Sequence, residues 1–329
     1  MKKIYLFTII VIIIIGAVFV FRGKKEKSEV TPIKIKVAFI QNDLGSVLPF
    51  IALEKGYFQQ EGLEIEPIYV NSGKEALNTL LSNDADLAII AETPLAYLSF
   101  SDQSIQIISE VAQKRDHKIL ARKDRGINQL SDLRGKKIAT PKGTSPEFAL
   151  EKALKLVGIN ESDFELINLS PPNLPPALVN GDVDAYAIWE PHIQNGVKLL
   201  DAKSIIIPLK DFAVKISTAG KRSYLSNNSV SVKKFLTALL RSEQFLGDNL
   251  DDGQVIITKH IAIDQETLKL IWPDYIFRVQ ITPSLLSSLQ EEGEWVNLQK
   301  PKTEQKPLPN YSEFINDGFL KEIDPSRIK

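Results

Sequence analysis

Three short segments place serine, threonine or glycine at predicted helix starts: Ser72-Gly73-Lys74, Thr93-Pro94 and Gly143-Thr144-Ser145. The first backbone N–H groups of a helix have no partner inside the helix, and the helix dipole makes this end positive, so such starts attract anions. Glycine lets a ligand approach the backbone closely, and the hydroxyls add hydrogen bonds without net charge. The chemistry that these segments favour is non-covalent binding of an oxyanion or a small polar solute.

Each segment also has a purely structural interpretation, because serine and threonine routinely cap helices. Ser72, Thr93 and Thr144 can serve as caps and nothing more. The ligand interpretation is favoured for the set, since ligands in open α/β sheets lie outside the carboxyl ends of the strands. The polar loop Gln41-Asn42-Asp43 follows the first predicted strand and points to the same edge, either as part of the site or as an ordinary loop.

Three further side chains are candidates for ligand binding. Trp189 ends a predicted strand, where an aromatic ring forms either a pocket wall or core. Glu92 and Glu190 would repel a simple anion and would prefer a ligand's amino group, which favours a zwitterion such as taurine or a heterocycle. Both glutamates can equally be solvated or paired with nearby lysine and arginine side chains.

Composition excludes several classes of chemistry. The chain has no cysteine, which rules out disulfides, thiolate metal sites and a cysteine nucleophile. His117, His192 and His260 are too far apart for a metal-binding helix motif, and no signature of a Walker loop, a serine–histidine–acid enzyme or a dinucleotide fold occurs. A net charge of −1 gives no basic surplus for nucleic acid. We therefore expect no catalytic residues, no metal, no cofactor and no nucleic-acid partner.

Alternating strand and helix patterns must position the candidate residues. Strands are predicted at 33–40, 63–70, 86–90, 137–140, 164–169, 184–189 and 205–209. Helices are predicted at 47–58, 72–81, from 93 onward, and at 143–157, 173–180, 231–247, 254–262, 265–271 and 282–298. A β-α-β-α-β order that occurs twice predicts an α/β fold with mostly parallel sheets and covering helices.

The N-terminus differs from the rest of the chain. The run from Ile4 to Phe21 has no charge and, as a helix, is long enough to cross a bilayer. It predicts an uncleaved membrane anchor with a polar tether after it; a cleaved signal peptide is the alternative, and the small-residue cleavage site is poor. Basic residues flank both ends, and the positive-inside rule alone would favour a cytoplasmic C-terminus.

Several motifs in the folded region resemble one family. The matching runs are Glu54-Lys55-Gly56-Tyr57-Phe58, Glu61-Gly62-Leu63, Ser72-Gly73 with Glu75-Ala76-Leu77, Asp84-Ala85-Asp86-Leu87-Ala88, Asp132-Leu133-Arg134-Gly135-Lys136-Lys137-Ile138-Ala139, Lys142-Gly143-Thr144-Ser145, Asn180-Gly181-Asp182-Val183-Asp184-Ala185 and Ile188-Trp189-Glu190-Pro191. Together they resemble the sulfonate/nitrate/taurine-binding solute receptors of ABC transporters and the related binders of thiamine pyrimidine precursors.

The resemblance implies a type II periplasmic-binding-protein fold with two lobes and a ligand between them. It places the anchor and tether at 1–31, lobe 1 at 33–117 plus 220–329, and lobe 2 at 118–219. The hinge crossings would fall at His117-Lys118 and Ser217-Thr218. The residues Lys114-Arg115 and Lys118 near the first crossing are by themselves interpreted as a plain surface run.

The same resemblance implies a cellular role, a location and partners for the chain. The chain would be a monomeric, non-enzymatic, extracytoplasmic receptor, tethered to the cell membrane, that delivers a sulfonate-, taurine- or nitrate-like solute to an ABC permease with its ATPase. The alternatives are a binder of a thiamine pyrimidine precursor or similar heterocycle, and a ligand-sensing adaptor for a membrane partner.

Overall fold

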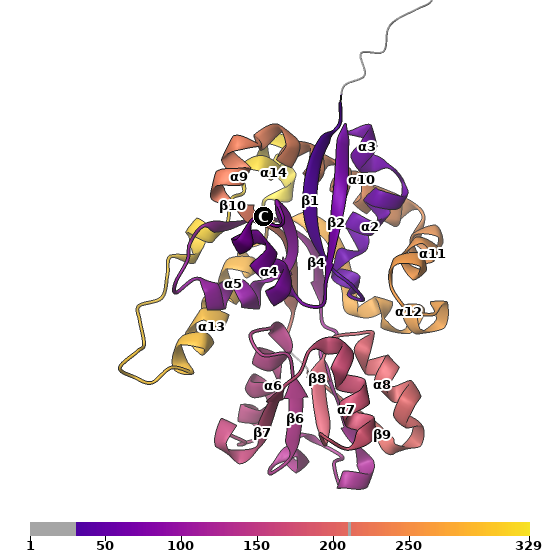
Figure 1. Cartoon of the computed structure of the whole chain (residues 1–329), viewed down its shortest axis with the longest axis vertical. Coiled ribbons are helices and arrows are strands. Elements are labelled where there is room, and N and C mark those ends of the chain that lie inside the picture. Colours follow the sequence, from indigo (N-terminus) through magenta and orange to yellow (C-terminus); the bar gives the residue numbers. More distant parts are fainter. Residues whose placement is uncertain (1–30, 210–211) are drawn as a thin grey trace, which may run out of the picture. The chain divides into compact units, whose positions relative to one another are not determined.

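The protein is described by a computed structural model that covers residues 31–209 and 212–329. The chain divides into a unit that ends at Pro32 and a second unit, Ile33–Lys329, which holds two β-sheets (Figure 1). The predicted membrane span Ile4–Phe21 lies outside the described residues. Within the described ranges, no helix combines the length and the apolar character that a membrane crossing requires.

The larger sheet has six strands in the order β11-β4-β10-β3-β1-β2. Its strands are β1 (Ile33–Ile40), β2 (Leu63–Val70), β3 (Leu87–Ala91), β4 (Ile105–Lys114), β10 (Val214–Lys221) and β11 (Tyr275–Gln280). The pairs β1–β2 and β1–β3 are parallel, as expected for β-α-β connections, whereas β10 runs antiparallel to both β3 and β4. We call this sheet and its helices lobe 1.

The smaller sheet has five strands in the order β7-β6-β8-β5-β9. Its strands are β5 (Lys118–Arg122), β6 (Lys137–Thr140), β7 (Glu165–Asn168), β8 (Ala185–Ile188) and β9 (Ser204–Pro208). Strand β6 is parallel to β7 and β8, and β5 is antiparallel to β8 and β9. We call this sheet and its helices lobe 2.

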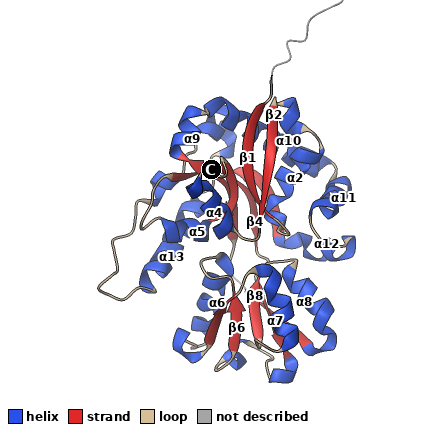
Figure 2. Ribbon diagram, viewed as in Figure 1, coloured by secondary structure: helices blue, strands red, loops and turns tan. Residues whose placement is uncertain are grey.

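Helices pack beside the strands of both sheets (Figure 2). In lobe 1 they are α2 (Val47–Glu54), α3 (Tyr57–Gln60), α4 (Gly73–Ser82), α5 (Glu92–Leu98), α9 (Arg222–Asn227), α10 (Ser229–Asp248), α11 (Leu250–His260), α12 (Gln265–Ile271), α13 (Pro283–Leu298) and α14 (Gly318–Ile323). In lobe 2 they are α6 (Ser145–Leu156), α7 (Leu174–Asn180) and α8 (His192–Leu200). The predicted helix 47–58 is divided at Gly56, whose φ of 68° is left-handed.

Two connections join the sheets, and one of them differs from the prediction. The first runs between the end of β4 at Lys114 and the start of β5 at Lys118, close to the predicted His117-Lys118. The predicted second crossing at Ser217-Thr218 is wrong, because these residues lie inside β10, opposite Ile90 and Ile89 of β3. The chain therefore returns to lobe 1 between Pro208 and Val214, and the predicted lobe boundary at 219–220 is too late.

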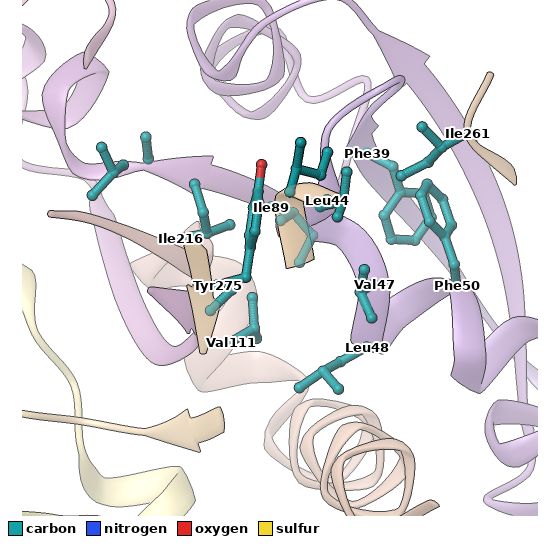
Figure 3. Packing of buried hydrophobic residues seen from close by; sticks show 14 of the residues in the cluster. Phe39, Leu44, Val47, Leu48, Phe50, Ile89, Val111, Ile216, Ile261 and Tyr275 are labelled. Atoms are coloured by element: carbon teal, nitrogen blue, oxygen red, sulfur yellow. The ribbon is translucent and has the colours of Figure 1, made fainter. Parts of the chain in front are cut away.

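Apolar side chains from β1, β4, β10 and α2 form the core of lobe 1. Phe39, Val111, Ile216 and Phe50 are almost wholly buried there, and Figure 3 shows Tyr275 beside Ile216 and Val111. Burial of such side chains contributes roughly 1.5–3 kcal/mol each. The core also holds the hydroxyl-bearing ring of Tyr275, which must find a polar partner.

Two buried carboxyl groups lie where α5 packs on α13. Glu92 is fully buried, and its two oxygens accept the backbone N–H of Lys215 at 3.0 and 2.9 Å. Glu292 is fully buried, and neither of its oxygens has a hydrogen-bond partner within the described structure. Burial raises the pKa of Glu92 to about 8, and burial together with the nearby Glu92 raises the pKa of Glu292 well above its usual value.

Gly196 on α8 provides a test of the packing in lobe 2. A Cβ atom there would lie 2.0 Å from the hydroxyl oxygen of Tyr186 and 2.5 Å from Cδ2 of Leu120, and the Tyr186 hydroxyl is held by the carbonyl of His192 at 2.8 Å. Gly196→Ala should therefore lower the free energy of unfolding by about 1–3 kcal/mol, measured by urea denaturation, although alanine favours helices. Gly247→Ala on α10 is the control, since nothing lies within 4 Å of its Cβ, and it should be neutral or stabilising. Equal effects of the two substitutions would contradict this packing.

The buried carboxyl pair predicts a pH dependence of stability. Because the folded protein keeps these protons above the ordinary pKa of 4.5, the contribution of the pair to stability is full below 4.5 and is lost as the pH rises through about 8. Glu292→Gln removes one titrating group. The variant should be more stable than the parent above pH 8 by roughly 1–3 kcal/mol, and little different near pH 4.5.

The measurement is the urea midpoint at both pH values, with Glu294→Gln as the matched control because Glu294 is exposed on the same helix. A difference between Glu292→Gln and the parent that stays constant with pH would show that the pair is not protonated in the folded protein.

Candidate functional site

The starts of α4 and α6 and the β3–α5 junction meet at one small cavity between the two sheets, which we call the inner cavity. Its lining residues come from both lobes: Ile40, Asp43, Gly73, Ala91, Pro94, Lys114, Thr144, Ser145, Trp189 and Ile216. The cavity measures about 10 Å³, room for roughly one water molecule. A larger ligand must therefore enter with the lobes further apart than they are here.

The turn before α6 presents two hydroxyl groups to the inner cavity. Gly143 has a left-handed φ of +80°, and its N–H donates to the carboxylate of Glu147 at 2.6 Å. Thr144 donates its hydroxyl to the carbonyl of Pro141, so this proton is already used. Ser145 begins the helix and is almost wholly buried.

Lys114, the last residue of β4, provides a buried positive charge. It is 1% exposed, donates to Oδ2 of Asp43 at 2.8 Å and lies 3.5 Å from Oδ2 of Asp116. Although burial opposes it, the two carboxylates raise the pKa of Lys114, which keeps the ammonium charged. The predicted surface run at Lys114 is therefore wrong at this residue.

A series of hydrogen bonds links the first crossing to the start of α6. Oδ1 of Asp116 lies 2.9 Å from Nδ1 of His117, and Nε2 of His117 lies 2.9 Å from Oγ of Ser145. The Tyr275 hydroxyl and the backbone N–H of Glu190 donate to the other oxygen of Asp116. Ser145 and Tyr275, which are far from Asp116 and His117 in sequence, thus complete an acid–imidazole–hydroxyl series that the sequence patterns did not reveal.

Trp189 forms a wall of the inner cavity, as one of the two predicted possibilities. It is 3% exposed, and the Lys114 ammonium lies 5.2 Å from its ring centroid. Its indole N–H is buried and has no partner within the described structure. A donor in this state favours a ligand that supplies an acceptor there.

Lys74 and Gly143 lie at the entrance to the cleft. They line an open pocket of about 520 Å³, the mouth pocket, which shares Pro94 with the inner cavity. The Lys74 ammonium donates to the carbonyl of Lys142 at 3.3 Å, which is a contact from lobe 1 to lobe 2.

The other predicted ligand residues do not line the inner cavity. Gln41 donates to the side chain of Asn71, and the side chain of Asn42 accepts the N–H of Ala262. Ser72 caps α4 by accepting the N–H of Glu75 at 3.2 Å. These side chains are thus engaged with other parts of lobe 1.

Glu92, Thr93 and Glu190 are buried but are likewise outside the cavity lining. Glu92 is occupied by the N–H of Lys215. Glu190 pairs with Lys118 at 2.9 Å, and Lys118 reaches Asp274 of lobe 1 at 3.0 Å. Lys118 thus joins the lobes beside the first crossing.

Lys114 and Asp116 are the residues of the charged cluster that sequence reasoning missed. Asp43 belongs to the loop Gln41-Asn42-Asp43, which the sequence already placed at this edge. Lys114 ends a strand that the patterns did not identify. No group of three or more histidine, aspartate or glutamate side chains in residues 31–209 and 212–329 is placed to hold a metal ion.

Comparisons with known proteins show which relatives and structures this chain is similar to. The chain is 26% identical to the putative aliphatic sulfonates-binding protein of Escherichia coli over 72% of this chain and 74% of that protein. Its fold matches the alkanesulfonate-binding protein SsuA of Xanthomonas axonopodis pv. citri bound to MOPS, with a TM-score of 0.75, 17% identity and coverage of 87% of this chain and 98% of that one.

The fold also occurs in a protein described as the desulfurization enzyme DSZB, with a TM-score of 0.64, 13% identity and coverage of 90% and 100%. At these identities the solved structures show the fold alone, a two-sheet α/β periplasmic-binding-protein fold. A family model described as "NMT1/THI5 like" matches residues 47–251, more than half of the chain. The chain belongs to the NMT1/THI5-like family.

Proposed function

We propose that this chain is the substrate-binding component of an ABC importer and captures a small organic solute or oxyanion in the inner cavity. The observation that carries the proposal is the convergence of two helix starts and a buried charged cluster on one cavity between two sheets. A cleft with a few convergent polar groups is the usual form of a small-molecule site, and we propose that this cavity reaches the size of such a site when the lobes separate.

Hinge closure is the proposed mechanism of capture. In the described residues, the sheets are joined by the short segment between β4 and β5, and a hinge of this kind absorbs the rotation of one lobe against the other. Contacts such as Lys74 with Lys142 and Tyr97 with Glu147 cross between the lobes. Ligand would enter an open form, and these contacts would form as the lobes close on it.

The proposed ligand class follows the names of the relatives. An aliphatic sulfonate, taurine or a nitrate-like anion would use the backbone N–H groups of the helix starts. A heterocycle such as a thiamine pyrimidine precursor is the alternative ligand. We also propose an extracytoplasmic location, with the run from Ile4 to Phe21 as the membrane tether and a permease with its ATPase as partner.

Trp189 provides a test of the binding function. If the indole forms the cavity wall and donates its free N–H to the ligand, Trp189→Phe should weaken ligand binding about 10-fold, the effect of losing one hydrogen bond to a ligand. Isothermal titration with taurine, ethanesulfonate, nitrate and 4-aminopyrimidine measures this effect, and small-angle scattering with saturating ligand should show compaction.

Trp272→Phe is the matched control, because Trp272 is partly buried in lobe 1 and does not line the cavity. Equal losses in the two variants would argue against a cavity role for Trp189. Absence of binding by all four solutes would argue against the proposed function.

Catalysis at Ser145 is a second candidate function, favoured by the Asp116–His117–Ser145 series. The order and the two 2.9 Å distances match the arrangement that activates a serine nucleophile. Burial lowers the pKa of His117, however, which makes it a weaker base than catalysis at neutral pH requires. Binding is therefore the better-supported function.

A serine-directed fluorophosphonate distinguishes the two functions. We expect mass spectrometry to find no adduct on Ser145 after incubation with the probe. An adduct that forms in the parent and disappears in both Ser145→Ala and His117→Gln would support catalysis instead.

A further inference from the structure

The direction of the hydrogen bonds around Ser145 follows from their partners. The Asp116 carboxylate can only accept, so the ring N–H of His117 is on Nδ1, which lies 2.9 Å from it. Burial lowers the pKa of His117, so the imidazole is neutral and its Nε2 carries no proton. Nε2 must then accept from Ser145, whose hydroxyl proton is used in this 2.9 Å bond. This tautomer is assigned from the network of hydrogen bonds.

The other side-chain oxygens that line the inner cavity also act only as hydrogen-bond acceptors toward a ligand. Thr144 donates its hydroxyl to the Pro141 carbonyl, which cannot return a proton. The side-chain oxygens of Asp43 accept from the Gly45 N–H at 2.6 Å and from the Lys114 ammonium at 2.8 Å. The side-chain oxygens that line the cavity therefore offer only lone pairs to a ligand.

The charges beside the cavity point the same way. Asp43 and Asp116 carry two formal negative charges, and Lys114 between them carries one positive charge. The ammonium is thus already compensated by its own carboxylates. These three side chains together carry a net negative charge. They would repel a ligand that brings only negative charge, whereas they would attract a ligand cation or N–H dipole.

We propose that this cleft requires a hydrogen-bond donor on its ligand, a protonated amine or the amino group of a heterocycle, and that Ser145 selects for it. The proposal rests on the proposed function and narrows its ligand class. An acidic group elsewhere on the ligand is compatible, because the Trp189 indole N–H and the starts of α4 and α6 supply donors. Aminosulfonates and aminopyrimidines meet the donor requirement, and nitrate and unsubstituted alkanesulfonates do not.

Matched ligand pairs test the donor requirement in the full-length parent chain. Taurine and ethanesulfonate differ by an amino group, and 4-aminopyrimidine and 4-methylpyrimidine differ by amino against methyl. Isothermal titration should show that the amino member of at least one pair binds roughly 10- to 100-fold tighter than its partner, the effect of one hydrogen bond to a charged or polar group.

A serine variant assigns the preference to Ser145. Ser145→Ala should reduce the preference to less than about 3-fold, because the acceptor is gone. Ser229→Ala is the control, since Ser229 also begins a helix but lies on α10, outside the cavity lining, and it should keep the parent's preference. The ligand pairs test the proposal in the parent chain even if Ser145→Ala does not fold.

The outcomes separate this proposal from the receptor function. If ethanesulfonate binds as tightly as taurine, and 4-methylpyrimidine as tightly as 4-aminopyrimidine, the donor requirement is overturned and the receptor function stands. If the preference exists but survives in Ser145→Ala, the assignment to Ser145 is overturned. If none of the four solutes binds, the receptor function for these ligand classes fails, and the donor requirement fails with it.

Discussion

The burial of the Asp116 carboxylate is the constraint on which the hinge and the cleft depend. Asp116 is fully buried in the short segment between the sheets, and an ionised carboxylate without partners there would cost several kcal/mol. Although burial opposes ionisation, the Lys114 ammonium, His117 and the Tyr275 hydroxyl hold its pKa well below the usual range. These partners come from β4, from the segment between β4 and β5, and from β11. The contacts that compensate the charge of Asp116 therefore hold this segment against lobe 1.

The same carboxylate determines the chemistry of the inner cavity. It fixes the His117 tautomer, His117 fixes the direction of the Ser145 hydroxyl, and Lys114 is held between Asp116 and Asp43. The Glu190 N–H donor and the Ser145 hydroxyl belong to lobe 2. Rotation of lobe 2 about the crossing would therefore change the partners of Asp116 and the polarity of the cavity together, which couples closure of the lobes to the groups that contact ligand.

Local patterns predicted most of the fold. The strands 33–40, 63–70 and 137–140 agree with the structure at both ends, because each alternates or is apolar between clear turn signals. The strands β4, β5, β10 and β11 were missed, because none of them follows the β-α-β order and each pairs antiparallel with its neighbours. The misplaced second crossing has the same cause, because the pairing partner of an antiparallel strand is set by tertiary structure.

The candidate site was predictable only where its chemistry is local. Thr144 and Ser145 were found because a glycine–hydroxyl helix start is visible within four residues. Lys114 resembles a surface lysine in sequence, and only the approach of Asp43 and Asp116 makes its burial possible. The partner Asp43 lies 71 residues from Lys114 in sequence, and a short sequence motif cannot reveal such a pair.

In this fold, features that the local sequence determines give a general affinity for polar solutes, whereas features that the tertiary structure determines give specificity for one ligand. Helix starts supply backbone donors of one general kind wherever a strand leads into a helix, so they give the cleft a broad attraction for polar solutes. Side-chain polarity depends on networks such as Tyr275–Asp116–His117–Ser145, whose members come from both sheets and the crossing. A chain can therefore share its family's fold and helix starts and still select a different ligand, because reversing one hydroxyl proton or one buried charge changes which solute satisfies the closed cavity.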